Sequence, residues 1–98
     1  LGDVYKRQKS RYVQAMYLAE KGDFDEARAK IKEGEESFVK GHEAHASLIQ
    51  KEACGEKTVP TILLMHAEDQ LMNAETTKIM AEEIIKLSQR IKKLEGGE

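Results

Sequence analysis

The feature that most constrains the fold is how rarely helix-breaking residues interrupt the chain. Pro60 is the only proline, and neither proline nor glycine occurs between residues 61 and 94. Alanine, glutamate, lysine, leucine and methionine are frequent, and these residues lose little side-chain freedom in a helix. The alternation of apolar and polar residues that is typical of a strand is nearly absent. The sequence therefore predicts an all-α protein with long helices.

Glycine divides the chain into three predicted helices, which cover residues 4–21, 23–54 and 61–94. Gly22 supplies the left-handed turn that often ends a helix, and Gly55 has the same role after the second helix. At about 1.5 Å per residue, the second and third helices would each reach roughly 45 to 50 Å. We predict an antiparallel three-helix bundle per chain, with so much lateral surface that it should oligomerise.

Length and charge exclude several classes of protein. The 98 residues suffice for one domain, residues 1–98, and 16 Lys and Arg against 18 Asp and Glu give a net charge of −2. We therefore expect no nucleic-acid binding, which needs a basic surface to neutralise phosphates. No apolar run approaches the ~20 residues that span a bilayer, so we expect no direct membrane insertion. The single cysteine, Cys54, fits a reducing compartment and favours a cytoplasmic location.

Helical spacing of apolar residues predicts which faces pack. On the first helix the stripe comprises Tyr12, Ala15, Met16 and Ala19. On the second it comprises Ala27, Ile31, Phe38, Leu48 and Ile49, with His45 on the same stripe. Gly34 and Gly41 interrupt the second helix at about 1 kcal/mol each relative to alanine. Close packing against a neighbouring backbone would explain these glycines, and a bend would explain them equally well.

The third helix has a mixed stripe that we expect to face inward. It comprises Ile62, Met65/His66, Asp69, Met72/Asn73, Thr76, Ile79/Met80, Glu83/Ile84, Leu87 and Ile91. His66 and Asp69 are three residues apart and so lie on one side of the helix. Two polar residues among apolar neighbours need a stabilising partner or a function, because an unpaired buried polar group costs roughly 1 to 3 kcal/mol.

Three explanations for His66 and Asp69 stay open on the residues alone. They form a buried hydrogen-bonded pair, or they lie at the solvent edge of the stripe, or they belong to a metal site. A metal site would need further ligands from another helix, and His42 and His45 are the candidates.

The third helix also contains a longer motif. Residues 63–72, LLMHAEDQLM, resemble the signature of the lactose/cellobiose-type IIA component of the sugar phosphotransferase system. In that family apolar residues precede His-Ala-Gln-Asp-His-Leu-Met. Gly-Asp-Phe at residues 22–24 is similar to the family, as is His42 followed by Leu-Ile-Gln-Lys-Glu-Ala at residues 48–53. The similarity runs from about residue 10 to residue 90, with matching helix breaks.

The resemblance implies a cytoplasmic phosphoryl carrier, a phosphotransferase component with a phosphohistidine intermediate. His66 would accept a phosphoryl group from the carrier protein HPr and pass it to a cysteine of the cognate IIB component. The sugar would be a β-linked disaccharide such as lactose, cellobiose or chitobiose. Asp69 would lie on the axis of a homotrimeric nine-helix bundle. There it would bind a divalent cation, expected to be Mg²⁺, together with its two symmetry mates.

The chain departs from the family pattern at four places. Gln70 replaces a second histidine, and Glu68 replaces a glutamine, so we expect altered transfer rates. A neighbouring imidazole can orient His66, whereas an extra carboxylate disfavours a dianionic phosphoryl group. Residues 1–8 do not resemble the family's opening, and we interpret them as truncated or foreign sequence that weakens the trimer. His45 stands where the family often has glutamine, and its role is open.

Two functional hypotheses follow. The first is the phosphoryl carrier with His66 as its acceptor. The second is a non-catalytic helical trimer that acts as a protein-interaction module, which the long helices and the changed residues Glu68 and Gln70 favour. A generic metal enzyme ranks below both, because the sequence places no third ligand.

Overall fold

The computed structural model describes residues 2–55 and 62–96, and these form three helices. Helix α1 spans Gly2–Lys21, α2 spans Phe24–Ala53 and α3 spans Ile62–Leu94. Side chains are described along these helices except at position 2, at positions 63 and 64, and at ten positions from 37 to 52. The described residues include no strand, so the predicted all-α class and the three helices are confirmed. The predicted loop around Pro60 lies outside the described residues.

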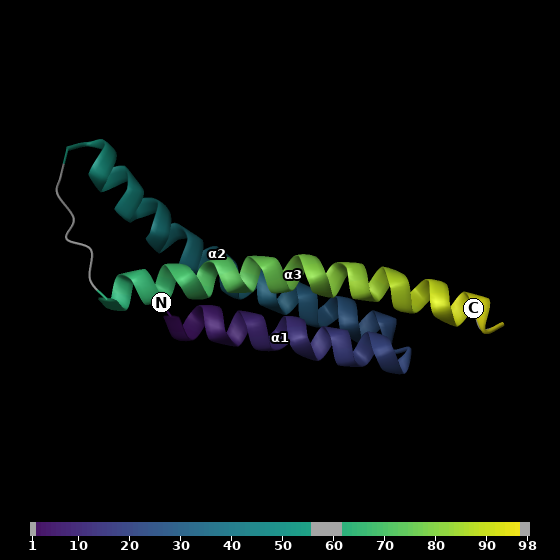
Figure 1. Ribbon diagram of the computed structural model, residues 1–98. Coiled ribbons are helices and arrows are strands. Elements are labelled where there is room, and N and C mark those ends of the chain that lie inside the picture. The colour runs from purple at the N-terminus through teal and green to yellow at the C-terminus, as the bar shows by residue number, and fades with distance from the viewer. Residues whose placement is uncertain (1, 56–61, 97–98) are drawn as a thin grey trace.

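The three helices form an elongated bundle of 59 × 21 × 16 Å. Helices α1 and α3 run in the same direction, and α2 runs antiparallel to both (Figure 1). α1 packs extensively against both α2 and α3, whereas α2 and α3 contact each other much less. The C-terminal half of α2 diverges from α3 at the end of the bundle where α1 and α3 begin (Figure 1). The middle and the opposite end of the bundle therefore contain the core.

The turn between α1 and α2 follows the glycine signal. Gly22 has φ = 91°, and its N–H donates to the carbonyl of Ala19 at 3.0 Å. The N–H of Asp23 donates to the carbonyl of Leu18 at 2.9 Å, which completes the paired hydrogen bonds of a Schellman motif. The predicted stop at Gly22 is thus confirmed.

The core is built from small and medium-sized side chains of all three helices. Its buried members are Tyr12, Ala15, Ala19, Ala27, Ile31, Ala81 and Ile85. Met16, Leu18 and Phe24 pack against them. The predicted stripe of α1 and the start of the predicted stripe of α2 are confirmed. The side chains of Phe38, His45, Leu48 and Ile49 lie outside those described.

Gly34 makes room for the ring of Tyr12. A Cβ atom at position 34 would lie 2.5 Å from Cε1 of Tyr12 and 2.9 Å from its Cζ. Such distances require the fully buried ring to move. Close packing therefore explains Gly34, although the neighbour is a side chain rather than a backbone. The surroundings of Gly41 lie outside those described.

The prediction that the mixed stripe of α3 faces inward is wrong for the single chain. The inner face of α3, which packs on α1, consists of Ala67, Leu71, Ala74, Ala81 and Ile85. The predicted mixed stripe, called the outer stripe below, is instead largely exposed. Ile84 is half-buried, whereas seven other apolar members are each more than half exposed: Ile62, Met65, Met72, Ile79, Met80, Leu87 and Ile91. The reason is steric, because alanines let two helix backbones approach closely, whereas long side chains keep them apart. Helix α3 is thus apolar on two faces.

Candidate functional site

His66 and Asp69 lie near the N-terminal end of α3, within its first eight residues. Both side chains are exposed, and their nearest neighbours on the outer stripe are Met65 and Met72, which are also exposed. The explanation as a buried hydrogen-bonded pair is therefore wrong. The structure instead places both residues on the exposed surface of the single chain, which is consistent with the explanation at the solvent edge and leaves the metal site open. An exposed imidazole amid apolar surface is accessible to a partner protein.

The two changed neighbours of His66 lie on different sides of α3. Gln70 follows His66 by four residues, so the two side chains are adjacent on the helix surface, and Gln70 is half-buried. Glu68 follows by two residues and points away from His66, towards α1. Burial raises the pKa of Tyr5 on α1, and the negative charges of Glu75 and Glu68 raise it further. Glu68 therefore acts on Tyr5 rather than standing beside the imidazole.

The described residues of one chain include no group of three His, Cys, Asp or Glu side chains that could hold a metal ion. Asp69 contributes a single carboxylate, and the side chains of His42 and His45 lie outside those described. A cation at Asp69 would therefore need ligands beyond the described residues of one chain. Cys54 is exposed at the end of α2.

Among the described residues, two ion pairs link α2 to the other two helices. Lys78 of α3 contacts Glu35 of α2 at 2.6 Å, and Arg11 of α1 contacts Glu33 of α2 at 2.8 Å. The hydrogen bond to Glu35 raises the pKa of Lys78, and burial opposes this effect. Sequence reasoning did not find these pairs, because their members are far apart in the chain and no helical spacing relates them.

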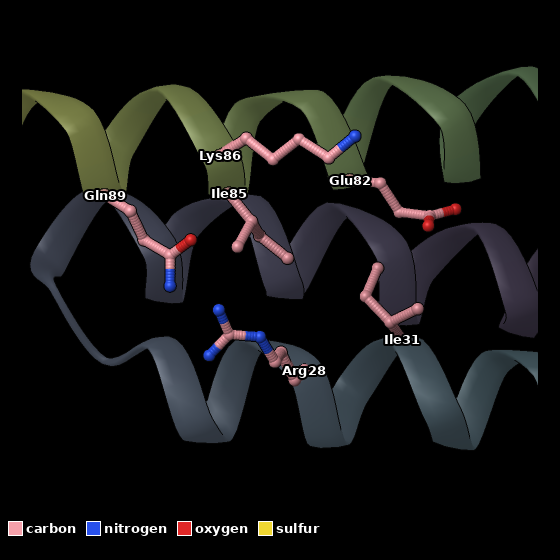
Figure 2. A pocket seen from close by; sticks show the side chains of 6 residues that line it. All are labelled: Arg28, Ile31, Glu82, Ile85, Lys86 and Gln89. Carbon is pink, nitrogen blue, oxygen red and sulfur yellow. The ribbon is translucent and has the colours of Figure 1, made fainter.

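A groove lies between α2 and α3 on the side away from α1, with a volume of about 270 Å³ (Figure 2). Ile31 and Ile85 form its apolar floor, and Arg28 and Gln89 extend into it from facing helices. Lys86 on its rim is about 30 Å along α3 from His66, given a rise of about 1.5 Å per residue. The groove is therefore separate from the His66 surface, and the sequence had not indicated it.

Basic residues near the C-terminal end of α3 are mostly exposed to solvent. Lys86, Arg90, Lys92 and Lys93 are exposed. The ammonium group of Lys92 also lies 5.5 Å from the centre of the Phe24 ring, so it covers the start of α2. None of the described helices is both long enough and apolar enough to span a membrane.

Comparison with known proteins places this geometry in a family. Residues 7–89 match the family model described as "PTS system, Lactose/Cellobiose specific IIA subunit". The match includes the whole segment that contains His66, Asp69 and Gln70. It also includes the Gly22 turn between α1 and α2, so it covers the fold as well as the site.

Individual relatives agree with the family match. The lichenan-specific phosphotransferase enzyme IIA component of Bacillus subtilis is 46% identical over 89 residues, which are 91% of this chain and 81% of that protein. The cellobiose-specific EIIA component of Lactococcus lactis is 37% identical, over 85% of this chain and 72% of that protein. The crystal structure of the cellobiose-specific enzyme IIA from Bacillus anthracis superposes with a TM-score of 0.87 at 36% identity. That superposition covers 91% of this chain and 82% of the other. This chain therefore belongs to the lactose/cellobiose-specific IIA family of the sugar phosphotransferase system.

Proposed function

We propose that the protein is a cytoplasmic phosphoryl carrier whose acceptor is His66. The phosphoryl group comes from phospho-HPr and passes to a cysteine of the cognate IIB component. The sugar taken up is a β-linked disaccharide such as lactose, cellobiose or chitobiose. One observation supports this most directly: within a segment that matches the family, His66 is an exposed imidazole bordered by exposed apolar side chains.

The chemistry needs little from the protein beyond access and orientation. A ring nitrogen of neutral His66 donates its lone pair to phosphorus and forms a P–N bond. The P–N bond of the donor histidine breaks, and its electron pair returns to the donor nitrogen. In the second step a thiolate sulfur attacks the same phosphorus, and the electron pair of the broken P–N bond returns to His66. The phosphoramidate is labile, which suits a relay.

The outer stripe is the surface on which we expect copies of the chain to assemble. Seven large apolar side chains lie more than half exposed along α3, interrupted by Asp69, Thr76 and Glu83. A contiguous apolar surface of this kind is unusual on a monomer and marks an interface. Three copies meeting along this stripe would give a homotrimer of nine helices, with Asp69 in its interior and His66 at the edge of the interface, where a partner protein still reaches it.

Asp69 fits a hard cation in such an assembly. Carboxylate oxygens are the ligands that Mg²⁺ and Ca²⁺ prefer. Three copies would bring three Asp69 carboxylates together, and their repulsion would be offset by a divalent ion, for which we propose Mg²⁺. When bound, the ion supplies charge neutralisation at the interface. Asp69 is thus an assembly residue, whereas His66 does the transfer.

Replacing Asp69 tests the assembly role. We expect Asp69→Ala to loosen the trimer or to remove its dependence on a divalent cation, because the axial carboxylates are gone. Sedimentation velocity with and without a chelator measures this. A wild-type trimer that ignores the chelator and is matched by an equally stable Asp69→Ala trimer would reject the axial role.

Intact-mass spectrometry tests the carrier function itself. The protein is incubated with phosphoenolpyruvate, enzyme I and HPr, in parallel with a His66→Gln variant whose fold is checked by circular dichroism. We expect one acid-labile phosphoryl group on the wild type and none on the variant. Retained acceptance in the variant would move the site elsewhere, with His42 and His45 the candidates. A folded, trimeric wild type that gains no phosphoryl group would instead support the interaction module.

A further inference from the structure

We propose that Gln70 positions the imidazole of His66, with its Oε1 accepting a hydrogen bond from Nδ1–H so that Nε2 presents the free lone pair. The inference rests on the proposed carrier function. It makes Gln70 a positioning residue, because the amide acts on phosphorus only through the ring.

Helix geometry brings these two side chains together. On α3 the positions within one turn of His66 are residues 62, 63, 69 and 70, and the polar ones are Asp69 and Gln70. Side chains on a helix lean towards its N-terminus, so the long Gln70 side chain covers the turn that contains His66. In the single chain no hydrogen bond between these two described side chains is formed, so making one requires a rotamer change.

Burial favours Gln70 as a support for the ring. Its side chain is half-buried, whereas His66 and Asp69 are exposed. A partly packed stem has already lost part of its rotamer freedom, so ordering the amide costs little more. Nδ1 is the ring nitrogen nearest the backbone and therefore the one that a side chain on the same helix reaches. Nε2 is at the tip of the ring, where a partner protein approaches.

The chemistry of transfer strengthens this hydrogen bond. When Nε2 bonds to phosphorus, the ring acquires positive charge, and the proton stays on Nδ1. A hydrogen bond from a charged donor is about twice as strong as one between neutral groups. Gln70 Oε1 therefore binds the developing imidazolium more tightly than the resting imidazole, and such differential binding lowers the barrier. An amide does this without adding a negative charge that would repel the phosphoryl group.

The test combines ring-nitrogen NMR with transfer kinetics on the full chain. Histidine labelled with ¹⁵N reports the ratio of the Nδ1–H to the Nε2–H tautomer at alkaline pH, and the His66 signal is assigned by its loss in His66→Gln. Rates of phosphoryl acceptance are measured at saturating phospho-HPr for the wild type, Gln70→Leu and Gln70→His. The control is Gln89→Leu, which removes an amide from the groove about 30 Å away. Sedimentation confirms that the variants assemble alike.

We expect Gln70→Leu to shift the ratio towards the Nε2–H tautomer and to lower the rate at saturation about tenfold, the scale of one neutral hydrogen bond. Gln70→His restores both, because a neutral imidazole also offers an acceptor nitrogen, and Gln89→Leu changes neither. An unchanged tautomer ratio in Gln70→Leu overturns the proposal. A shifted ratio in a protein that accepts no phosphoryl group leaves the hydrogen bond standing and refutes the carrier function.

Discussion

The two apolar faces of α3 differ in the size of their side chains and in what they contact. The inner face is dominated by alanine, with Ala67, Ala74 and Ala81 at most 5% exposed against α1. The outer stripe carries methionine, isoleucine and leucine, and seven of these residues are more than half exposed. Small side chains pack within the fold, whereas the large ones form the surface on which we propose that copies of the chain assemble. One helix thus serves two kinds of packing.

This difference also separates fold from function. His66 and Asp69 are both on exposed surface and take no part in the core of the single chain. Changes on the inner face should therefore act on folding, and changes on the outer stripe on assembly and transfer. Making the same substitution on one face of α3 and at an exposed position of α2 tests whether the two faces have these different roles.

The largest effect should follow a charge placed on the outer stripe. We expect Leu87→Lys to convert the oligomer to monomer, because each ammonium group buried in the interface costs several kcal/mol. The control is Ala29→Lys at an exposed position of α2. Sedimentation equilibrium measures the association. If Leu87→Lys assembles as well as the control, the outer stripe is not the interface.

A smaller effect should follow added bulk on the inner face. Ala81 is fully buried against the core, so Ala81→Leu should lower the free energy of unfolding by about 1 to 3 kcal/mol through overpacking. Ala29→Leu makes the same chemical change at an exposed site and should stay within about 0.5 kcal/mol of the wild type. Urea unfolding at a fixed protein concentration compares them. Equal stabilities would show that the inner face tolerates bulk, contrary to the steric explanation.

The smallest effect should come from the ion pair between α2 and α3. The side chains of Lys78 and Glu35 are 34% and 48% exposed, so solvent screens the pair. A double-mutant cycle with Lys78→Met and Glu35→Gln should give a coupling of about 0.5 to 1 kcal/mol that falls with added salt. The pair Lys86–Glu83 within α3 is more exposed and should give less. A larger coupling for Lys86–Glu83 would contradict the role of burial.

The same ion pair predicts a pH dependence of stability. The pKa of Lys78 is raised above its usual 10.5, chiefly by the hydrogen bond to Glu35. A folded-state pKa above the unfolded one means that the contribution is complete at neutral pH. It is lost only as the pH rises above 10.5 and through the folded-state pKa. In the Lys78→Met variant this contribution to the alkaline loss of stability should be absent, whereas the part that comes from the raised pKa of Tyr5 should remain.

Much of this molecule was readable from the sequence, because helix length and helix ends depend on local residues. The absence of breaking residues between positions 61 and 94 predicted α3, and Gly22 predicted the turn between α1 and α2. The motif around His66 predicted the family, since a run of specific residues is a stronger signal than periodicity. Residues 2–8 continue α1 in the structure.

The sequence by itself therefore determined the three helices and the identity of the candidate site. Only the tertiary structure decided which apolar face of α3 is inside. A periodic pattern of hydrophobic residues is dominated by the large ones, because they are the most hydrophobic. Close packing of two helices instead favours small residues such as alanine. Tertiary structure also decided that Gly34 accommodates Tyr12 and that Lys78 pairs with Glu35. Each of these contacts depends on the distance and orientation between neighbouring helices, which the spacing of residues within a single helix does not determine.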